Sequence, residues 1–317
     1  LPSMIQLRAE RIGGELRFKW RETLIALIIV FLIVPMVAIF FATYISDRTI
    51  GIGYIAANSV PASSASVAYV MLAEGNIELA TVLVILSIII ALFAAPLYVG
   101  LYAQSVHINL PITVLAESVA IALLIPLILG QLIRYILIVR RARKLAVDKT
   151  VAFNCKEKAM KGIGAKESYS IDKEVVKCLE NKIMTRIKPV LSIWTITFML
   201  TLVSLLIANK ARLLISKPNL AIYIISAQLG IYTIIILSLL VASILLKMKY
   251  RDHMATAFIS LTKNESVAAA MAVLAIGPTA AIPAALIPAI QPVVAILYIS
   301  SSPIIKRILK DMVINID

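Results

Sequence analysis

The sequence predicts an all-α integral membrane protein. Of its 317 residues, 61% are hydrophobic and 15% are charged, whereas soluble domains average about 45–50% apolar and about 25% charged residues. Runs without a charge, such as 24–46 and 221–246, are long enough to cross about 30 Å of hydrocarbon as helix. Because these runs are continuously apolar rather than alternating in period two, a β-barrel is not expected.

Eight apolar segments are expected to span the membrane. They are 24–46, 50–73, 77–104, 112–140, 188–208, 219–247, 254–277 and 279–302. The chain begins with Leu rather than Met, and its first residues, LPSMIQL, resemble the tail of an earlier span. We therefore expect an N-terminally incomplete copy from which two helices are missing.

Basic residues flank alternate ends of these segments. They are Arg8, Arg11, Arg17, Lys19 and Arg21 before the first, a dense run over 140–188, Lys247, Lys249 and Arg251 after the sixth, and Lys306, Arg307 and Lys310 after the last. The positive-inside rule then predicts a multi-pass plasma-membrane protein with both termini in the cytoplasm, although the outward loop 209–218 is also basic. The net charge of +14 thus indicates loop asymmetry rather than nucleic-acid binding.

The polar stretch 141–187 divides the chain. Residues 1–140 are assigned to an incomplete first repeat plus the first span of a second. Residues 141–187 form a basic cytoplasmic loop, and 188–317 hold the rest of the second repeat. Both cysteines, Cys155 and Cys178, lie in this loop, where a structural disulfide is not expected. A role of its basic residues in binding lipid headgroups stays open.

Segment 50–73 is interrupted by polar and small residues around Pro61, which removes a backbone donor from a helix. The polar residues at this break are Asn58, Ser59, Ser63, Ser64 and Ser66. Interrupted helices at mid-membrane are where transporters place substrate and ion sites. Close packing of small residues between helices is the alternative explanation for the serines.

Segment 254–277 is interrupted by three consecutive polar residues, Lys263, Asn264 and Glu265. A charge near the bilayer centre costs about 2.5–3.5 kcal/mol even on insertion scales. A charge pair buried only for structure is one explanation. The presence of a second interrupted segment in the same chain favours a transport site instead.

The order of the segments repeats. A long span, an interrupted span and a proline-containing span occur over 24–104 and again over 219–302, with Pro96 in the first copy and Pro283, Pro288 and Pro292 in the second. With two helices before residue 1, each repeat would have five helices, with 112–140 and 188–208 as the counterparts of the missing pair. An odd number of helices makes the repeats inverted.

Several stretches resemble the superfamily of bile acid:sodium symporters and arsenical-resistance arsenite permeases. PASSASVAYVMLAEGNIELA (61–80) is similar to the broken-helix motif of the symporters. The stretches similar to the arsenite permease branch are 2–16, 117–137, 188–218, 277–297 and AFISLTKNESVAAAMAV (257–273). The resemblance implies a ten-helix fold of two inverted repeats, with 50–73 and 254–277 as crossing helices in a core that moves against a panel domain.

The chain departs from both branches at positions that matter for binding. Ala62 stands where the permeases have an arsenic-binding cysteine. Ser66 is kept from the symporters' Ser-Asn pair, but Val67 replaces the Asn. Their remaining sodium ligands fall at Ala80, Val84 and Ser260.

Lys263 is then expected to supply a positive charge where relatives hold sodium. Burial disfavours the charged form of a lysine, so Lys263 could take and release a proton. Its expected partners are Glu265, Glu117 or Asn264. These residues, together with Ser260 and with Asn58, Ser63, Ser64 and Ser66 of the first break, make up the candidate substrate and ion site.

The function favoured at this point is efflux of arsenite or a related small oxyacid by alternating access, with proton coupling as an option. The first alternative is sodium-coupled symport of an organic anion, and the second is a membrane sensor that binds without transporting. No cofactor or metal is expected besides H⁺ or Na⁺. The sequence has no phosphate-binding glycine loop that would indicate an ATP-driven pump, and its two histidines, His107 and His253, suggest no enzyme.

Overall fold

The computed structural model describes residues 19–63, 65–147 and 218–311, together with separated residues between 175 and 215. By its internal contacts the chain divides into two compact units. One comprises 7–123 and 199–317, and the other 1–6 and 124–198. All the regular elements in the described residues are helices, and five are long and apolar enough to cross a membrane. These candidate spans are Trp20–Ala42, Ile77–Ser105, Thr113–Ala142, Pro218–Leu245 and Pro278–Ser300.

The first candidate span changes helical register in its middle. It comprises α3 (Trp20–Ile28), the π-helix η2 (Ile29–Ile33) and α4 (Val34–Ala42). In η2 the amide of Val34 donates to the carbonyl of Ile29, five residues back. The next amide in this register would belong to residue 35, which is a proline and has no N–H. The carbonyl of Val30 is therefore left without a backbone donor.

The segment predicted to be interrupted at Pro61 is two helices. The first, α5, runs Arg48–Ser59, and α6 runs Ser66–Leu72. Asp47 caps α5 by accepting hydrogen bonds from Thr49 N and Ile50 N, at 3.0 and 3.2 Å. After α6 the chain reverses and enters α7 (Ile77–Ser105), which continues as a helix through Pro96.

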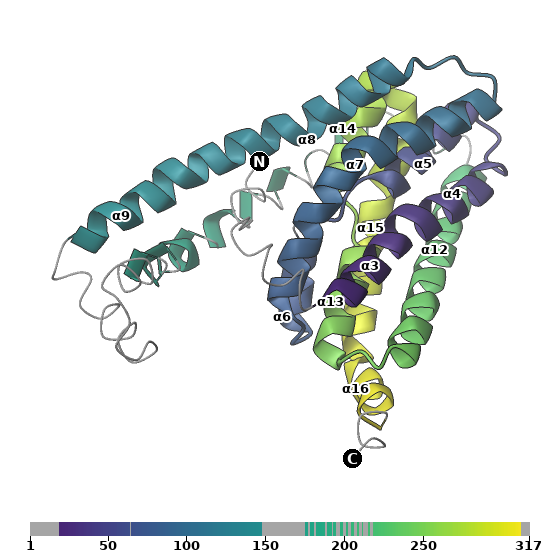
Figure 1. Cartoon of the computed structure of the whole chain (residues 1–317). Coiled ribbons are helices and arrows are strands. Elements are labelled where there is room, and N and C mark those ends of the chain that lie inside the picture. Colours follow the sequence, from purple (N-terminus) through teal and green to yellow (C-terminus); the bar gives the residue numbers. More distant parts are fainter. Residues whose placement is uncertain are drawn as a thin grey trace. The chain divides into compact units, whose positions relative to one another are not determined.

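The second interrupted segment is divided in the same way. It comprises α13 (Tyr250–Leu261) and α14 (Glu265–Ala275), preceded by α12 (Pro218–Leu245). A short 3-10 turn, η4 (Pro278–Ala281), then leads into α15 (Ile282–Ser300), and α16 (Ser302–Asp311) follows. Figure 1 shows these helices grouped with α3–α7 in one bundle, which agrees with the contacts of α13 with α3, α6, α7 and α12. Both predicted interruptions are present, at 60–65 and 262–264.

The second unit contains helix where a basic loop was predicted. The apolar helix α8 (Ile112–Arg134) continues through the π-helix η3 (Tyr135–Val139) into α9 (Arg140–Val147). Ala142 packs against Val175 and Leu179. Residues 148–174 lie outside the described part of the chain, as do ten of the 21 residues of predicted span 188–208. Cys178 is disulfide-bonded, so the expectation that this segment would hold no disulfide was wrong.

Candidate functional site

The two helix breaks cross and pair with each other. Ala62 and Lys263 form an antiparallel β-bridge. It is closed by two backbone hydrogen bonds, from Ser63 N to the Thr262 carbonyl at 3.0 Å and from Asn264 N to the Pro61 carbonyl at 2.9 Å. The Ser66 and Thr262 hydroxyls also hydrogen-bond across the crossing. The breaks thus satisfy part of each other's backbone, as non-helical backbone at membrane depth requires.

A side chain from the following helix stabilises each break. The Ser87 hydroxyl of α7 accepts a hydrogen bond from Ala62 N at 3.1 Å. The Gln291 side-chain carbonyl of α15 accepts one from Lys263 N, also at 3.1 Å. The two paired residues are therefore held alike, each by a buried polar side chain of the next proline-containing helix.

The Lys263 ammonium reaches the irregular part of the first span. Its Nζ donates to the Val30 carbonyl at 3.2 Å and lies 5.7 Å from the centre of the Phe31 ring. The π register and Pro35 leave that carbonyl without a backbone donor, so the lysine supplies the missing hydrogen bond. A cation near an aromatic face is also favourable, by about 0.5–2 kcal/mol.

None of the partners expected for Lys263 forms a hydrogen bond or ion pair with its ammonium. Glu265 interacts with it only electrostatically. The Asn264 side-chain carbonyl accepts a hydrogen bond from the Ser266 hydroxyl at 2.8 Å. Glu117 is exposed on α8 and lies outside the buried crossing.

A second buried polar contact links α5 to α12. Asn58 and Gln228 exchange two hydrogen bonds, at 3.1 and 3.2 Å, and Asn58 also donates to the Tyr54 carbonyl at 3.0 Å. Both amides are almost completely buried. Such a reciprocal pair satisfies each side chain and fixes the position of α5 beside α12.

Glu265 begins α14 and is 4% exposed. Neither of its carboxyl oxygens has a hydrogen-bond partner, and the same holds for the buried hydroxyls of Tyr54 and Tyr232. Both tyrosines interact electrostatically with Glu265. Gln228 lies near the Tyr232 hydroxyl, but its amide hydrogen-bonds with Asn58 instead.

The other predicted site residues have local roles or lie apart. The Ser260 hydroxyl donates to the Thr256 carbonyl of its own helix at 2.8 Å. The Ser63 hydroxyl accepts from Ala65 N, at 3.2 Å. Ser59 is buried within α5, and Ser64 lies outside the described residues.

Several polar residues of the crossing were missed from the sequence. They are Tyr54, Ser87, Gln228, Tyr232, Thr262 and Gln291. The one available signal was the rarity of amide side chains in otherwise apolar spans, which applies to Gln228 and Gln291.

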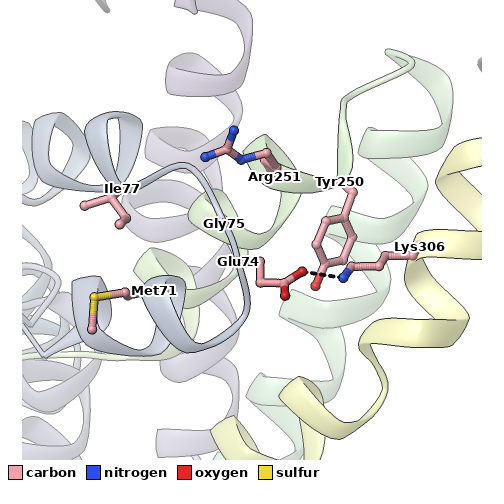
Figure 2. A pocket seen from close by; sticks show the side chains of 7 residues that line it. All are labelled: Met71, Glu74, Gly75, Ile77, Tyr250, Arg251 and Lys306. Carbon is pink, nitrogen blue, oxygen red and sulfur yellow. Dashed lines mark hydrogen bonds and ion pairs between the residues drawn. The ribbon is translucent and has the colours of Figure 1, made fainter.

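A separate pocket of about 470 Å³ lies where the turn after α6 meets α13 and α16. Figure 2 shows its seven lining residues, with Lys306 beside the Tyr250 ring and joined to Glu74. Lys306 Nζ lies 2.6 Å from a Glu74 carboxyl oxygen. This hydrogen bond lowers the pKa of Glu74 and raises that of Lys306. The contact joins α16 to the turn that follows the first broken helix.

A partly buried network lies near the same end of the larger unit. Asp252 of α13 accepts hydrogen bonds from Lys19 at 2.5 Å and from the Asn76 amide at 2.8 Å. Burial lowers the pKa of Lys19, but the hydrogen bond and charge of Asp252 outweigh it and leave the pKa raised. The beginnings of α3, α7 and α13 are thereby tied together.

Comparison with known proteins agrees with a transporter architecture. The chain matches no curated protein in this comparison. The profile of the Sodium Bile acid symporter family matches residues 1–217, a stretch that includes the first broken helix and Lys19. No such match supports the arsenite permease branch in particular. The chain therefore belongs to the sodium bile acid symporter family, and it is a multi-pass membrane protein and a secondary transporter of a small solute, not an enzyme.

Proposed function

We propose that this protein carries a small organic anion across the membrane together with sodium, by alternating access at the helix crossing. The observation that carries the proposal is the buried crossing of the two broken helices. The family to which the chain belongs is named for the symport of sodium and bile acid. Carriers of this kind bind their substrates where interrupted helices meet near mid-membrane. Here the crossing holds the Lys263 ammonium and the positive N-terminal end of α14, and both favour an anion.

An organic anion is favoured over arsenite by the residues at the crossing. Trivalent arsenic is bound best by soft thiolates, and the paired residue at the permease cysteine position is Ala62. Both cysteines of the chain lie in the segment 141–187, and neither broken helix contains one. A carboxylate or sulfonate needs only hydrogen-bond donors and positive charge, which the crossing contains.

Two inverted five-helix repeats are part of the same proposal. The similar support of Ala62 by Ser87 and of Lys263 by Gln291 favours a two-fold relation between the α5–α7 and α13–α15 regions. The proposal also includes a boundary between the two repeats between residues 104 and 112, a ten-helix core and panel, and cytoplasmic termini in a plasma membrane.

The test is transport in proteoliposomes made with the full-length protein. We expect uptake of a radiolabelled bile acid, or of a smaller carboxylate from a panel, when sodium is high outside. Uptake should stop when potassium replaces sodium, and the Lys263→Met variant should transport poorly because the crossing loses its fixed positive charge. Uptake that is indifferent to sodium would refute the coupling. Binding without any uptake would refute transport and favour a sensor.

A further inference from the structure

Glu265 is a buried acid whose surroundings do not match an ionised carboxylate. A carboxylate inside a protein normally accepts two or more hydrogen bonds or pairs with a cation. Here neither oxygen accepts one, and Lys263 donates to the Val30 carbonyl rather than to Glu265. Two phenols, Tyr54 and Tyr232, interact electrostatically with Glu265, and neither hydroxyl is within hydrogen-bond distance of its carboxyl.

No other charged group of the neighbouring elements faces Glu265. The helix α14 packs against η4, α15 and α5, and η4 has no ionisable residue. The ionisable residue of α15, Tyr298, hydrogen-bonds with His253. On α5, Arg48 donates to the Val106 carbonyl, and on α12, Tyr223 donates to the Phe41 carbonyl. Among the residues that the structure describes, Lys263 is thus the single charge that acts on Glu265.

The free energies favour a neutral carboxyl at this position. Burying an ionised carboxylate is costly even after the protein relaxes. The N-terminus of α14 stabilises a negative charge, but by less than this burial costs. Attraction to Lys263 adds to this, but no ion pair or hydrogen bond forms between the two groups. A proton on Glu265 removes the buried charge and with it most of this cost.

The packing also discriminates between a proton and a larger cation. The two carboxyl oxygens and the two phenol oxygens have essentially no surface that a water molecule could touch. A sodium ion with its oxygen ligands needs space comparable to that of a water molecule. A proton needs none.

We propose that Glu265 is a proton-binding site of the transport cycle. It holds a proton in this conformation, in which neither carboxyl oxygen accepts a hydrogen bond and the phenols of Tyr54 and Tyr232 act on it only electrostatically. When movement of the broken helices lets water reach Glu265, the carboxyl releases the proton to the solvent as hydronium, and it takes one up again when water is excluded. This inference rests on the proposed transport function and adds a proton to its coupling.

The protonated acid can be detected without any transport. Infrared spectra of the purified protein should contain the C=O stretch of a buried carboxylic acid at neutral pH, and the band should vanish in Glu265→Gln. The matched control is Glu78→Gln, because Glu78 is an exposed glutamate at the start of α7, and it should leave the band unchanged. Tyr54→Phe should shift the band by removing a polar hydroxyl that acts electrostatically on the carboxyl. A wild-type spectrum that lacks this band, or a band that survives in Glu265→Gln, would overturn the proposal.

Transport then tests the cycle. With a pH dye inside proteoliposomes and sodium equal on both sides, the addition of substrate should change the internal pH for the wild type and for Glu78→Gln. It should not do so for Glu265→Gln. If substrate moved as many protons in Glu265→Gln as in the wild type, the proton coupling would be refuted. If no substrate moved under any gradient, the proposed function would be refuted, and the infrared result would decide whether Glu265 is protonated.

Discussion

The close approach of α5 to the turn between α14 and α15 depends on Gly53. A Cβ atom added there would lie 1.8 Å from the Ala280 carbonyl oxygen and 2.6 Å from its carbon, both backbone atoms of η4. Ordinary contacts begin near 3.4 Å, so Gly53→Ala must separate the two backbones by about 1.6 Å. Overpacking usually costs about 1–3 kcal/mol. Because neither backbone can rotate away, we expect Gly53→Ala to lower the free energy of unfolding by about 3 kcal/mol, the upper end of this range.

The matched control for this prediction is Gly230→Ala on α12. Its added Cβ would meet the Phe41 ring tip at 3.0 Å, and a half-buried ring can turn aside. Both variants gain about the same helix propensity, so the difference between them isolates the backbone clash. Equilibrium unfolding in mixed micelles, followed by circular dichroism, should give about 3 kcal/mol less stability for Gly53→Ala and under about 1 kcal/mol less for the control. Equal losses in the two variants would refute the reasoning.

Three further predictions follow from single contacts. Tyr98→Phe should cost about 1–3 kcal/mol in the same unfolding assay, because the tyrosine hydroxyl donates to the Phe31 carbonyl at 2.6 Å; an unchanged stability would contradict this. Lys263→Met should lose a similar amount by leaving the Val30 carbonyl without its donor, while a donor-retaining Lys263→Arg should lose less if its longer side chain fits. The lowered pKa of Glu74 means that its contact with α16 is present at neutral pH and is lost as the pH falls through that pKa; spin-label distances should change on acidification in the wild type and be independent of pH in Glu74→Gln.

Much of the fold could be predicted from local properties of the sequence. Apolar length predicts the spans, and both helix interruptions coincide with residues that disfavour a buried helix: Pro61 in the first and the polar run from Lys263 to Glu265 in the second. The segment 141–187 was harder to predict, because its polarity also suits an amphipathic helix such as α9, which packs through Ala142.

The partners within the site could not be predicted, because they depend on tertiary contacts. Ser87 and Gln291 are single polar residues in apolar helices, and nothing near them in the sequence indicates a helix break about 25 residues earlier. Lys263 was expected to pair with a side chain. Its acceptor is the Val30 carbonyl, which is available because a π-helix meets a proline, and such a change of backbone register leaves no side-chain pattern.

The paired backbone at the crossing limits how this protein can move. Separation of Ala62 from Lys263 would break two backbone hydrogen bonds far from water, where each lost partner costs about 1–3 kcal/mol. The two broken helices, about 200 residues apart in the sequence, are therefore held together at one point by paired backbone. A solute bound at the crossing would become accessible from the other side of the membrane when the two broken helices move together as one body. The backbone pairing between Ala62 and Lys263 would stay intact during that movement.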